Sequence, residues 1–332
     1  MSGDELERIA NSIRTFEGLT RKQPISKFVP LFLKESKELL RGNTYLGDDA
    51  ALLDTDGEYY MLFAADGIWS RLMTSPWWAG YSSVLVNVND IAAMGGEPLA
   101  MVNVVASSHG GVWEQIAKGI AEGVRKFGVP MVGGHLHPDT PYDSLAVAIL
   151  GRVRKGCEIR SDTARAGDVV VAAYDLDGRV GPNSPYSWES TTTKSPREIA
   201  RMYECMRVLG ERHLLSAGKD VSNPGLVGTL SMLCESSGLG ATVQLENIPL
   251  PEEVALSRWV LVHPATGFVV STRPEDARDV LEVFEGAGLA AAVIGQLHTE
   301  RKVYIARGDE RVMVFDLTSE SITGLVGGEE HK

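Results

Sequence analysis

Acidic side chains recur in short apolar stretches across the first half of the chain. Asp48 and Asp49 lie between a glycine and two alanines, Asp66 follows two alanines, and Asp90 lies among Val, Ile and Ala. A carboxylate that is removed from water must be neutralised, hydrogen-bonded or bound to a cation. Lys and Arg are scarce around these positions, so the pattern predicts divalent metal, and Mg²⁺ usually binds between carboxylates and substrate phosphates. The acidic set therefore indicates nucleotide chemistry.

Three of these positions also have an ordinary structural interpretation. Asp48 and Asp49 precede a short apolar stretch, where Asp commonly forms a turn by hydrogen-bonding its own backbone. Adjacent strand residues point to opposite faces, so both carboxylates can serve one site only if the backbone bends or if each has its own partner. Asp66 ends a strand pattern, where either a turn residue or a ligand-binding group of an α/β protein is expected.

Asn87 and Asp90 are three residues apart in a helical pattern and therefore share a face of that helix. The residues around them are largely apolar, which predicts burial on several sides. An unpartnered aspartate would be costly there, so Asp90 is expected to bind a metal or a strong donor.

The segment around His135 carries a weaker signal. Gly133 and Gly134 follow an apolar run and precede His135 and His137. Two histidines at this spacing can belong to a metal site or to a surface loop. A binuclear hydrolase would need further His and acidic ligands at matching strand ends, which the other histidines do not supply.

Asp220 begins a segment that leads into a second helical pattern. Ser222 or Asn223 predicts an N-cap, with Pro224 at the first helical position. A helix N-terminus is equally suited to an anion. The sequence has no GxxxxGK[ST] loop and no GxGxxG motif, so it supports neither a Walker site nor a dinucleotide-binding fold.

Composition favours a cytoplasmic protein that acts on small molecules. The chain has 332 residues, 44% hydrophobic content and a net charge of −12. This charge argues against nucleic-acid binding, which needs clustered Lys and Arg. No apolar run approaches a membrane span, and the N-terminus lacks the features of a signal peptide. The cysteines Cys157, Cys205 and Cys234 form no CxxC pair, so neither a disulfide framework nor a zinc knuckle is indicated.

Strand and helix patterns alternate in both halves of the chain and predict a mixed α/β fold. The predicted boundary separates residues 1–155 from 156–332. Residues 176–195, rich in Gly, Pro, Ser and Thr, predict a loop that moves. The expected strands are 58–65, 99–106, 144–153, 169–173, 241–245, 267–271, 290–294 and 303–306, and the main expected helices are 77–94, 113–127, 196–217, 224–237 and 274–286.

Taken together, these segments resemble the aminoimidazole-ribonucleotide synthetase (AIR synthase) superfamily, which includes thiamine-monophosphate kinase and selenophosphate synthetase. The order and spacing of the motifs match over nearly the whole chain. Residues 17–22 and 222–225 resemble above all the uncharacterised AIR synthase-related branch that includes the methanogenesis marker 2 proteins. The segments that carry the superfamily resemblance are 47–51, 65–67, 87–95, 133–135, 165–168 and 220–226.

The resemblance implies an N-terminal α/β domain whose sheet pairs with that of a partner into a barrel across a homodimer, and a C-terminal α/β domain. It also implies ATP as substrate, bound with Mg²⁺, and phosphoryl transfer to a small-molecule acceptor or activation of that acceptor. The metal ligands it implies are Asp48, Asp49, Asp66 and Asp90. The expected nucleotide contacts are Asn87, His135, Asp220 and Asn223, with Arg21 and Lys22 closing over the phosphates unless they are simply a solvated basic pair.

Two positions depart from the superfamily pattern. His135 and Asn223 stand where its members carry carboxylates, so fewer or differently placed metals are expected. These departures leave two alternatives to an ATP-dependent enzyme with an unidentified acceptor. One is an ATP- or ADP-binding sensor or assembly protein without turnover, and the other is a thiamine-monophosphate kinase with altered motifs.

Overall fold

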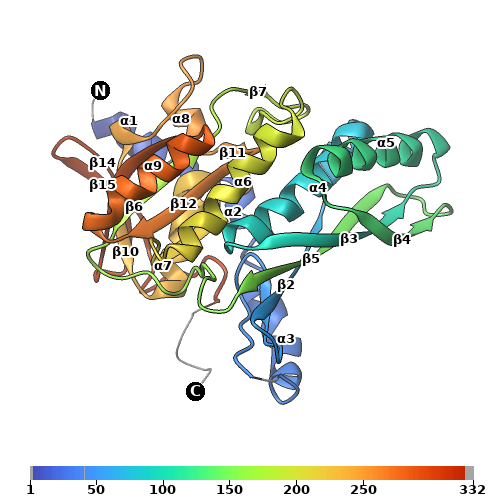
Figure 1. Cartoon of the computed structure of the whole chain (residues 1–332). Coiled ribbons are helices and arrows are strands. Elements are labelled where there is room, and N and C mark those ends of the chain that lie inside the picture. Colours follow the sequence, from blue (N-terminus) through green and yellow to red (C-terminus); the bar gives the residue numbers. More distant parts are fainter. Residues whose placement is uncertain (1–2, 41, 326–332) are drawn as a thin grey trace.

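The computed structural model describes residues 3–40 and 42–325. Within that part of the chain, strands form sheets of five, seven and three strands, and helices cover the two larger sheets (Figure 1). The predicted mixed α/β fold is confirmed. No helix in these two ranges is long and apolar enough to cross a membrane.

The five-stranded sheet is built from the first half of the chain. Its strand order is β1-β2-β5-β3-β4, and only β3 and β4 run parallel. Helices α4 and α5 lie along one of its faces (Figure 1). The strands are β1 (Ala51–Leu53), β2 (Tyr59–Gly67), β3 (Glu97–Ala106), β4 (Met131–His137) and β5 (Ser144–Arg154), and the helices are α4 (Pro76–Ala93) and α5 (Gly110–Phe127).

Small residues let α4 and α5 approach each other closely. A Cβ added at Gly80 of α4 would lie 2.1 Å from the carbonyl oxygen of Ile116, and one added at Gly119 of α5 would lie 1.9 Å from that of Trp77. These distances leave no room for a side chain, so the glycines are required by packing. The close pairing fixes α4, and with it Asp90, over the sheet.

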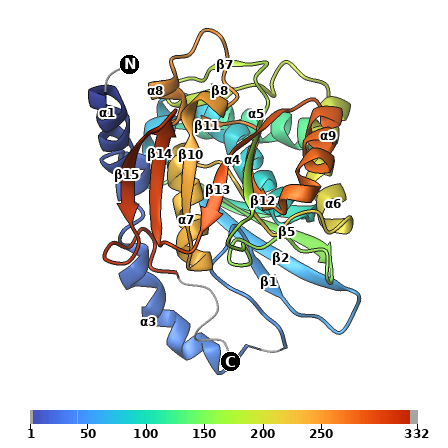
Figure 2. The same cartoon turned by 90° about the vertical axis from the view of Figure 1, so that its left-hand side faces the viewer.

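The seven-stranded sheet is built from the second half, in the order β15-β14-β10-β13-β6-β12-β9. Alternate residues of β6 enter different cores: Val171 and Ala173 pack with α6 and α9, while Val170 and Ala172 pack with α1 and α7 (Figure 2). The strands are β6 (Val169–Tyr174), β9 (Ala217–Asp220), β10 (Gly240–Gln244), β12 (Gly267–Thr272), β13 (Ala290–His298), β14 (Lys302–Arg307) and β15 (Glu310–Asp316).

The helices of this half form two layers, and the layer of α6 and α9 shares one apolar core with α4. The first helix, α1, packs against β14 and β15 rather than against the first sheet (Figure 2). The domain boundary predicted at residue 155 stays a prediction; β5 ends at Arg154 and β6 begins at Val169. The helices are α1 (Gly3–Arg14), α2 (Glu17–Thr20), α3 (Ile25–Lys37), α6 (Pro196–Glu211), α7 (Gly225–Ser237), α8 (Leu256–Trp259) and α9 (Ala277–Ala287).

Two expectations about the second half need correction. The helix predicted for residues 196–217 ends at Glu211, and the chain then enters β9. The loop predicted for 176–195 contains β7 (Arg179–Val180) and β8 (Ser187–Glu189), which pair with each other, while β8 also pairs with β11 (His263–Pro264). Short strands in a Gly- and Pro-rich stretch leave no clear period-2 pattern, so the sequence did not reveal them.

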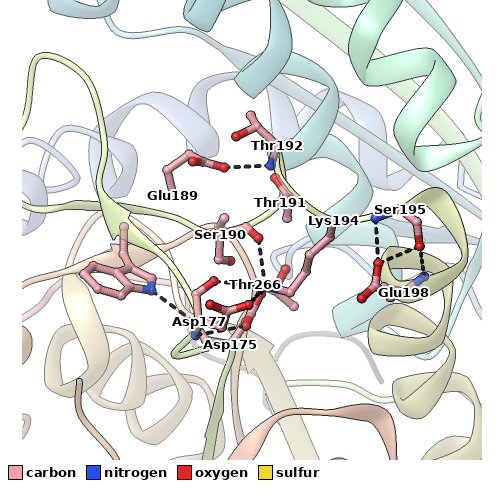
Figure 3. A network of polar contacts seen from close by, with 12 residues as sticks. Asp175, Asp177, Glu189, Ser190, Thr191, Thr192, Lys194, Ser195, Glu198 and Thr266 are labelled. Carbon is pink, nitrogen blue, oxygen red and sulfur yellow. Dashed lines mark hydrogen bonds and ion pairs between the residues drawn. The ribbon is translucent and has the colours of Figure 1, made fainter. Parts of the chain in front are cut away.

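A network of polar contacts anchors the segment that contains β7 and β8 (Figure 3). Nζ of Lys194 is 3.0 Å from Oδ2 of Asp175 and donates to the carbonyl oxygens of Asp177 at 2.9 Å and Ser190 at 3.0 Å. The side chains of Lys194 and Asp175 are only 12% and 2% exposed. One buried ion pair therefore ties the two ends of the segment together.

Candidate functional site

A cavity of about 520 Å³ lies between the two larger sheets. Residues from both halves of the chain line it, including the end of β2, one stripe of α4 and the end of β9. Its size is typical of a small-molecule site. The charged side chains along its wall are five carboxylates, Asp48, Asp49, Asp66, Asp90 and Asp220, and three cations, Arg21, Lys22 and Lys219.

Asp48 and Asp49 lie in a bend that directs both carboxylates to the same partner. Gly47 has a φ of 97°, in the left-handed region that favours glycine, and β1 starts only at Ala51. Nζ of Lys219 is therefore able to contact both side chains, at 3.1 Å from Oδ1 of Asp48 and in a shorter contact with Oδ1 of Asp49. The backbone N–H of Ser161 also donates to Oδ2 of Asp48 at 2.6 Å.

The Lys219 ammonium is a buried charge that its neighbours stabilise. Its side chain is 9% exposed. Burial alone would lower the pKa of Lys219, but the charges of Asp49 and Asp48 outweigh burial and hold that pKa above its ordinary value. Burial raises the pKa of Asp49, and the charge of Lys219 opposes this shift.

Asp66, Asp90 and Asp220 face the same cavity without such a partner. Among residues 3–40 and 42–325, no hydrogen bond or ion pair reaches their carboxylate groups. Burial raises the pKa of Asp90 well above its ordinary value, and the charges of Asp66 and Asp220 raise it further. Burial, followed by the charge of Asp49, does the same for Asp220.

Asp66 is exposed, whereas Asp90 is half-buried and Asp220 is buried. Protein atoms crowded around its carboxylate nevertheless raise its pKa, while the charges of Lys22 and Arg21 oppose that rise. Acidic side chains are therefore concentrated in one cavity, which Arg21 and Lys22 also line. Such an arrangement favours binding of a cation between the carboxylates.

Arg21 and Lys22 reach the cavity from the end of α2. The guanidinium of Arg21 lies 5.2 Å from the centre of the Trp69 ring, which also lines the cavity. A Cβ added at Gly18 would lie 2.2 Å from the carbonyl oxygen of Asn223, so α2 packs directly against the segment before α7. This contact places both basic residues on the wall that also contains Asn223.

The N-cap predicted at Ser222 or Asn223 is not formed. Helix α7 begins at Gly225, its N-cap residue is Pro224, and no side chain caps it. Asn223 lines the cavity instead.

The structure does not bring Asn87 or His135 to this cavity. The stripe of α4 that lines it consists of Trp78, Ser82, Leu85, Val86, Asn89 and Asp90. Asn87 follows Gly80 and Val84 at helical spacing on the side that meets α5, where it is fully buried and donates from Nδ2 to the carbonyl oxygen of Ser83 at 2.8 Å.

His135 lies on β4, the outermost strand of the five-stranded sheet. It is exposed, and the centre of its ring is 4.3 Å from that of His137. The resemblance implied a place beside the phosphates, but β4 lies at the edge of the sheet with β3 as its neighbour.

Three cavity residues were missed in the sequence. Lys219 was not singled out because its strand, β9, is only four residues long, and the helix predicted for residues 196–217 overlapped the first residue of that strand. Asn89 was passed over in favour of Asn87. His263 lines the cavity with a buried Nδ1 that has no hydrogen-bond partner, and burial lowers its pKa to about 4, so its imidazole is neutral at pH 7.

The unpaired carboxylates suit Mg²⁺ that is bound together with phosphate. In the part of the chain that the structure describes, no three His, Cys, Asp or Glu side chains lie close enough to hold one metal ion by themselves. Mg²⁺ commonly uses one or two carboxylates and completes its octahedral shell with water and phosphate oxygens. Asp66, Asp90 and Asp220 offer carboxylate oxygens of the kind that Mg²⁺ binds, so these residues fit a magnesium ion that is bound together with phosphate.

Models of the two parts of one protein family match this chain. The model described as AIR synthase related protein, N-terminal domain, matches residues 47–153, and the C-terminal domain model matches residues 165–307. An uncharacterised protein of Methanocaldococcus jannaschii is 41% identical over 321 residues, which cover 96% of this chain and 99% of that protein. The thiamine-monophosphate kinase of Synechococcus elongatus is 29% identical over 299 residues, which cover 82% of this chain and 89% of the kinase.

Among solved structures, PurL of Thermotoga maritima complexed with ADP is similar to this chain with a TM-score of 0.72 and 23% identity. The similarity covers 90% of this chain and 49% of the PurL chain, so this chain spans about half the length of PurL. At that level of identity the likeness shows a shared fold.

Proposed function

This chain belongs to the AIR synthase related family, and from that membership and the cavity we propose that it binds ATP with Mg²⁺ and phosphorylates or activates a small-molecule acceptor. Relatives with named activities include phosphoribosylformylglycinamidine synthase subunits and thiamine-monophosphate kinases. The T. maritima PurL structures include complexes with ADP and with ATP. These names support nucleotide use in the family.

One observation carries the proposal: Asp66, Asp90 and Asp220 converge, unpaired and with raised pKa values, on one cavity that Arg21 and Lys22 also line. Bringing carboxylates together costs free energy that a ligand with divalent cations can recover. The lining side chains carry two more negative than positive formal charges. A single divalent ion would balance that excess.

The roles of the protein's own residues follow from their positions. Asp66, Asp90 and Asp220 would hold Mg²⁺, which when bound neutralises charge on the phosphates. Arg21 and Lys22, which line the same cavity, would contact phosphate oxygens as positive charges. Asn89, the neighbour of Asp90, ties this end of α4 to Ala265 through a hydrogen bond of 3.1 Å from its Nδ2 to the carbonyl oxygen. Catalysis in this scheme rests on positioning and charge neutralisation.

The proposal is tested by following ATP with ³¹P NMR in the presence of Mg²⁺ and a protein-free fraction of small metabolites. We expect steady formation of ADP or another ATP product that requires both the protein and the metabolite fraction. Asp220→Asn should abolish it, and Asp309→Asn, on an exposed turn, should leave it intact. ATP that stays unchanged under all metabolite fractions would count against an enzyme.

A second function, nucleotide binding without turnover, is favoured by Lys219 and Asn223. Both reduce the negative charge of the cavity relative to a fully acidic site. A sensor or assembly protein would bind ATP or ADP but form no product in the same experiment. Steady product formation excludes this alternative.

The third function, thiamine-monophosphate kinase, is favoured by the relative in S. elongatus. It predicts that thiamine monophosphate alone, among added metabolites, is converted to the diphosphate. A thermal-shift screen of metabolites with an ATP analogue present would identify other acceptors. Stabilisation by a different metabolite and none by thiamine monophosphate would remove this alternative.

We also propose a homodimer, because the five-stranded sheet exposes an apolar face. Phe63 on β2 pairs with Leu150 on β5, and these side chains are 50% and 36% exposed. Val102 and Val104 of β3 continue the patch at 44% and 46% exposure. A contiguous apolar face of this kind marks an interaction surface, and a second copy of the chain would bury it.

A further inference from the structure

Lys219 lies between two adjacent carboxylates of the kind that can bind Mg²⁺ beside a phosphate. Its Nζ reaches Oδ1 of both Asp48 and Asp49. The side chains of Asp48 and Asp49 are 1% and 9% exposed, so the three charges are withdrawn from water together. Buried charges are tolerated when each has a partner of opposite sign.

All four oxygens of this carboxylate pair already have donors from the protein. Oδ1 of Asp48 accepts from the backbone N–H of Asp49 at 2.9 Å as well as from Lys219, and Oδ2 accepts from the N–H of Ser161 at 2.6 Å. Oδ1 of Asp49 accepts from Lys219, and Oδ2 accepts from the N–H of Asp220 at 3.4 Å. A metal ion could bind Asp48 or Asp49 only by displacing these donors.

The other three carboxylates of the cavity present the opposite situation. Asp66, Asp90 and Asp220 receive no hydrogen bond or ion pair from the described residues. The cavity is thus divided into a side whose charge is already compensated and a side whose charge is not.

We propose that Lys219 is a fixed cation that takes the place of one divalent metal ion at Asp48 and Asp49. Metal binding is thereby confined to the side of Asp66, Asp90 and Asp220. This inference deepens the proposed function, since it concerns the ions that would accompany ATP. An ammonium is always present, whereas the occupancy of a metal site depends on metal concentration, so the protein needs fewer divalent ions than five aspartates suggest.

The test counts bound Mn²⁺, used alone as the probe, from the loss of the free-ion signal in electron paramagnetic resonance. Lys219→Met removes the ammonium but keeps most of the side-chain volume, and we expect it to bind one more Mn²⁺ per chain than the wild type. Lys219→Arg keeps the charge and should bind the wild-type number.

Lys155→Met is the matched control, because Nζ of Lys155 pairs with Asp54 at 2.6 Å outside the cavity. It breaks a Lys–Asp pair without changing the cavity, so its Mn²⁺ count should equal that of the wild type. Equal counts for Lys219→Met and the wild type would overturn the proposal.

Lys219→Met could fail to fold without metal, because it leaves two buried carboxylates without their cation. In that case the proposal predicts that Mn²⁺ restores the native circular dichroism spectrum and a cooperative thermal transition. A variant that stays unfolded in Mn²⁺ also overturns it. The experiment contains no nucleotide, so a wild type that fails to bind ATP would refute the proposed function without deciding the role of Lys219.

Discussion

The hydroxyl of Tyr203 on α6 donates a hydrogen bond of 2.7 Å to Oδ1 of Asn89 on α4. Both side chains are buried. The bond joins the helix that covers the first sheet to a helix that covers the second, one residue before Asp90. The position of Asp90 relative to β9 therefore depends on a contact between the two halves of the chain.

Tyr203→Phe should lower the free energy of unfolding by about 1–3 kcal/mol, because it leaves the buried Oδ1 of Asn89 without a donor. We also expect weaker binding of Mg-ATP, since α4 loses one of its attachments. Urea unfolding and calorimetric titration measure the two effects. A variant with wild-type stability would show that water or another donor replaces the hydroxyl.

Asp90→Asn should change the pH dependence of stability in a defined direction. Burial, with the charges of Asp66 and Asp220, raises the pKa of Asp90 well above 3.8. A group whose pKa is raised by folding stabilises the fold below its unfolded pKa, and this contribution is lost as the pH rises through the folded pKa. In the absence of metal, the variant should match the wild type near pH 4 (about the unfolded pKa) and become increasingly more stable than it at higher pH. Urea unfolding of both proteins over a pH series checks this, and parallel curves would contradict it.

Val104→Lys should prevent association through the exposed face of the five-stranded sheet. Val104 is 46% exposed and lies in the apolar patch that also contains Val102. A charge placed in a buried interface without a partner is unfavourable, so the variant should sediment as a monomer where the wild type sediments as a dimer. Glu310→Lys, on the exposed start of β15, is the control. A wild type that is monomeric at high concentration would remove the dimer proposal.

Lys194→Met should destabilise the protein by about 3–5 kcal/mol, because it leaves Asp175 buried without its cation. The double variant Lys194→Met/Asp175→Asn removes both charges and should recover part of that loss. Urea unfolding of Lys194→Met, Asp175→Asn and the double variant gives the coupling free energy between the two side chains. Additive losses would show that the ion pair in Figure 3 does not hold the segment between β6 and α6.

Much of the fold could be predicted from local patterns, because helix and strand periods are strong where elements are long. Helix α4 was expected at 77–94 and spans Pro76–Ala93, and β5 was expected at 144–153 and spans Ser144–Arg154. The carboxylates of Asp66 and Asp90 were singled out because acidic residues are unusual in such elements. All four predicted metal ligands line one cavity. Metal binding by Asp66 and Asp90 remains a proposal, whereas Asp48 and Asp49 are paired with Lys219.

What could not be predicted depends on how distant elements meet. The pairing of Lys219 with Asp48 spans 171 positions and arises only after β9 joins the second sheet. The resemblance to the superfamily implied a place beside the phosphates for His135, but the order of strands in the sheet decides where it lies. The choice between Asn87 and Asn89 required knowing which face of α4 meets α5.

The most direct test of the central claim is calorimetric titration of ATP with Mg²⁺ into the wild type, Asp90→Asn and the control Asp309→Asn. We expect saturable binding by the wild type and the control, and binding by Asp90→Asn that is at least tenfold weaker (about 1.4 kcal/mol). Without Mg²⁺ the difference between the three proteins should shrink, because Asp90 acts through the metal. Equal Mg-ATP binding by Asp90→Asn and the wild type would contradict the account.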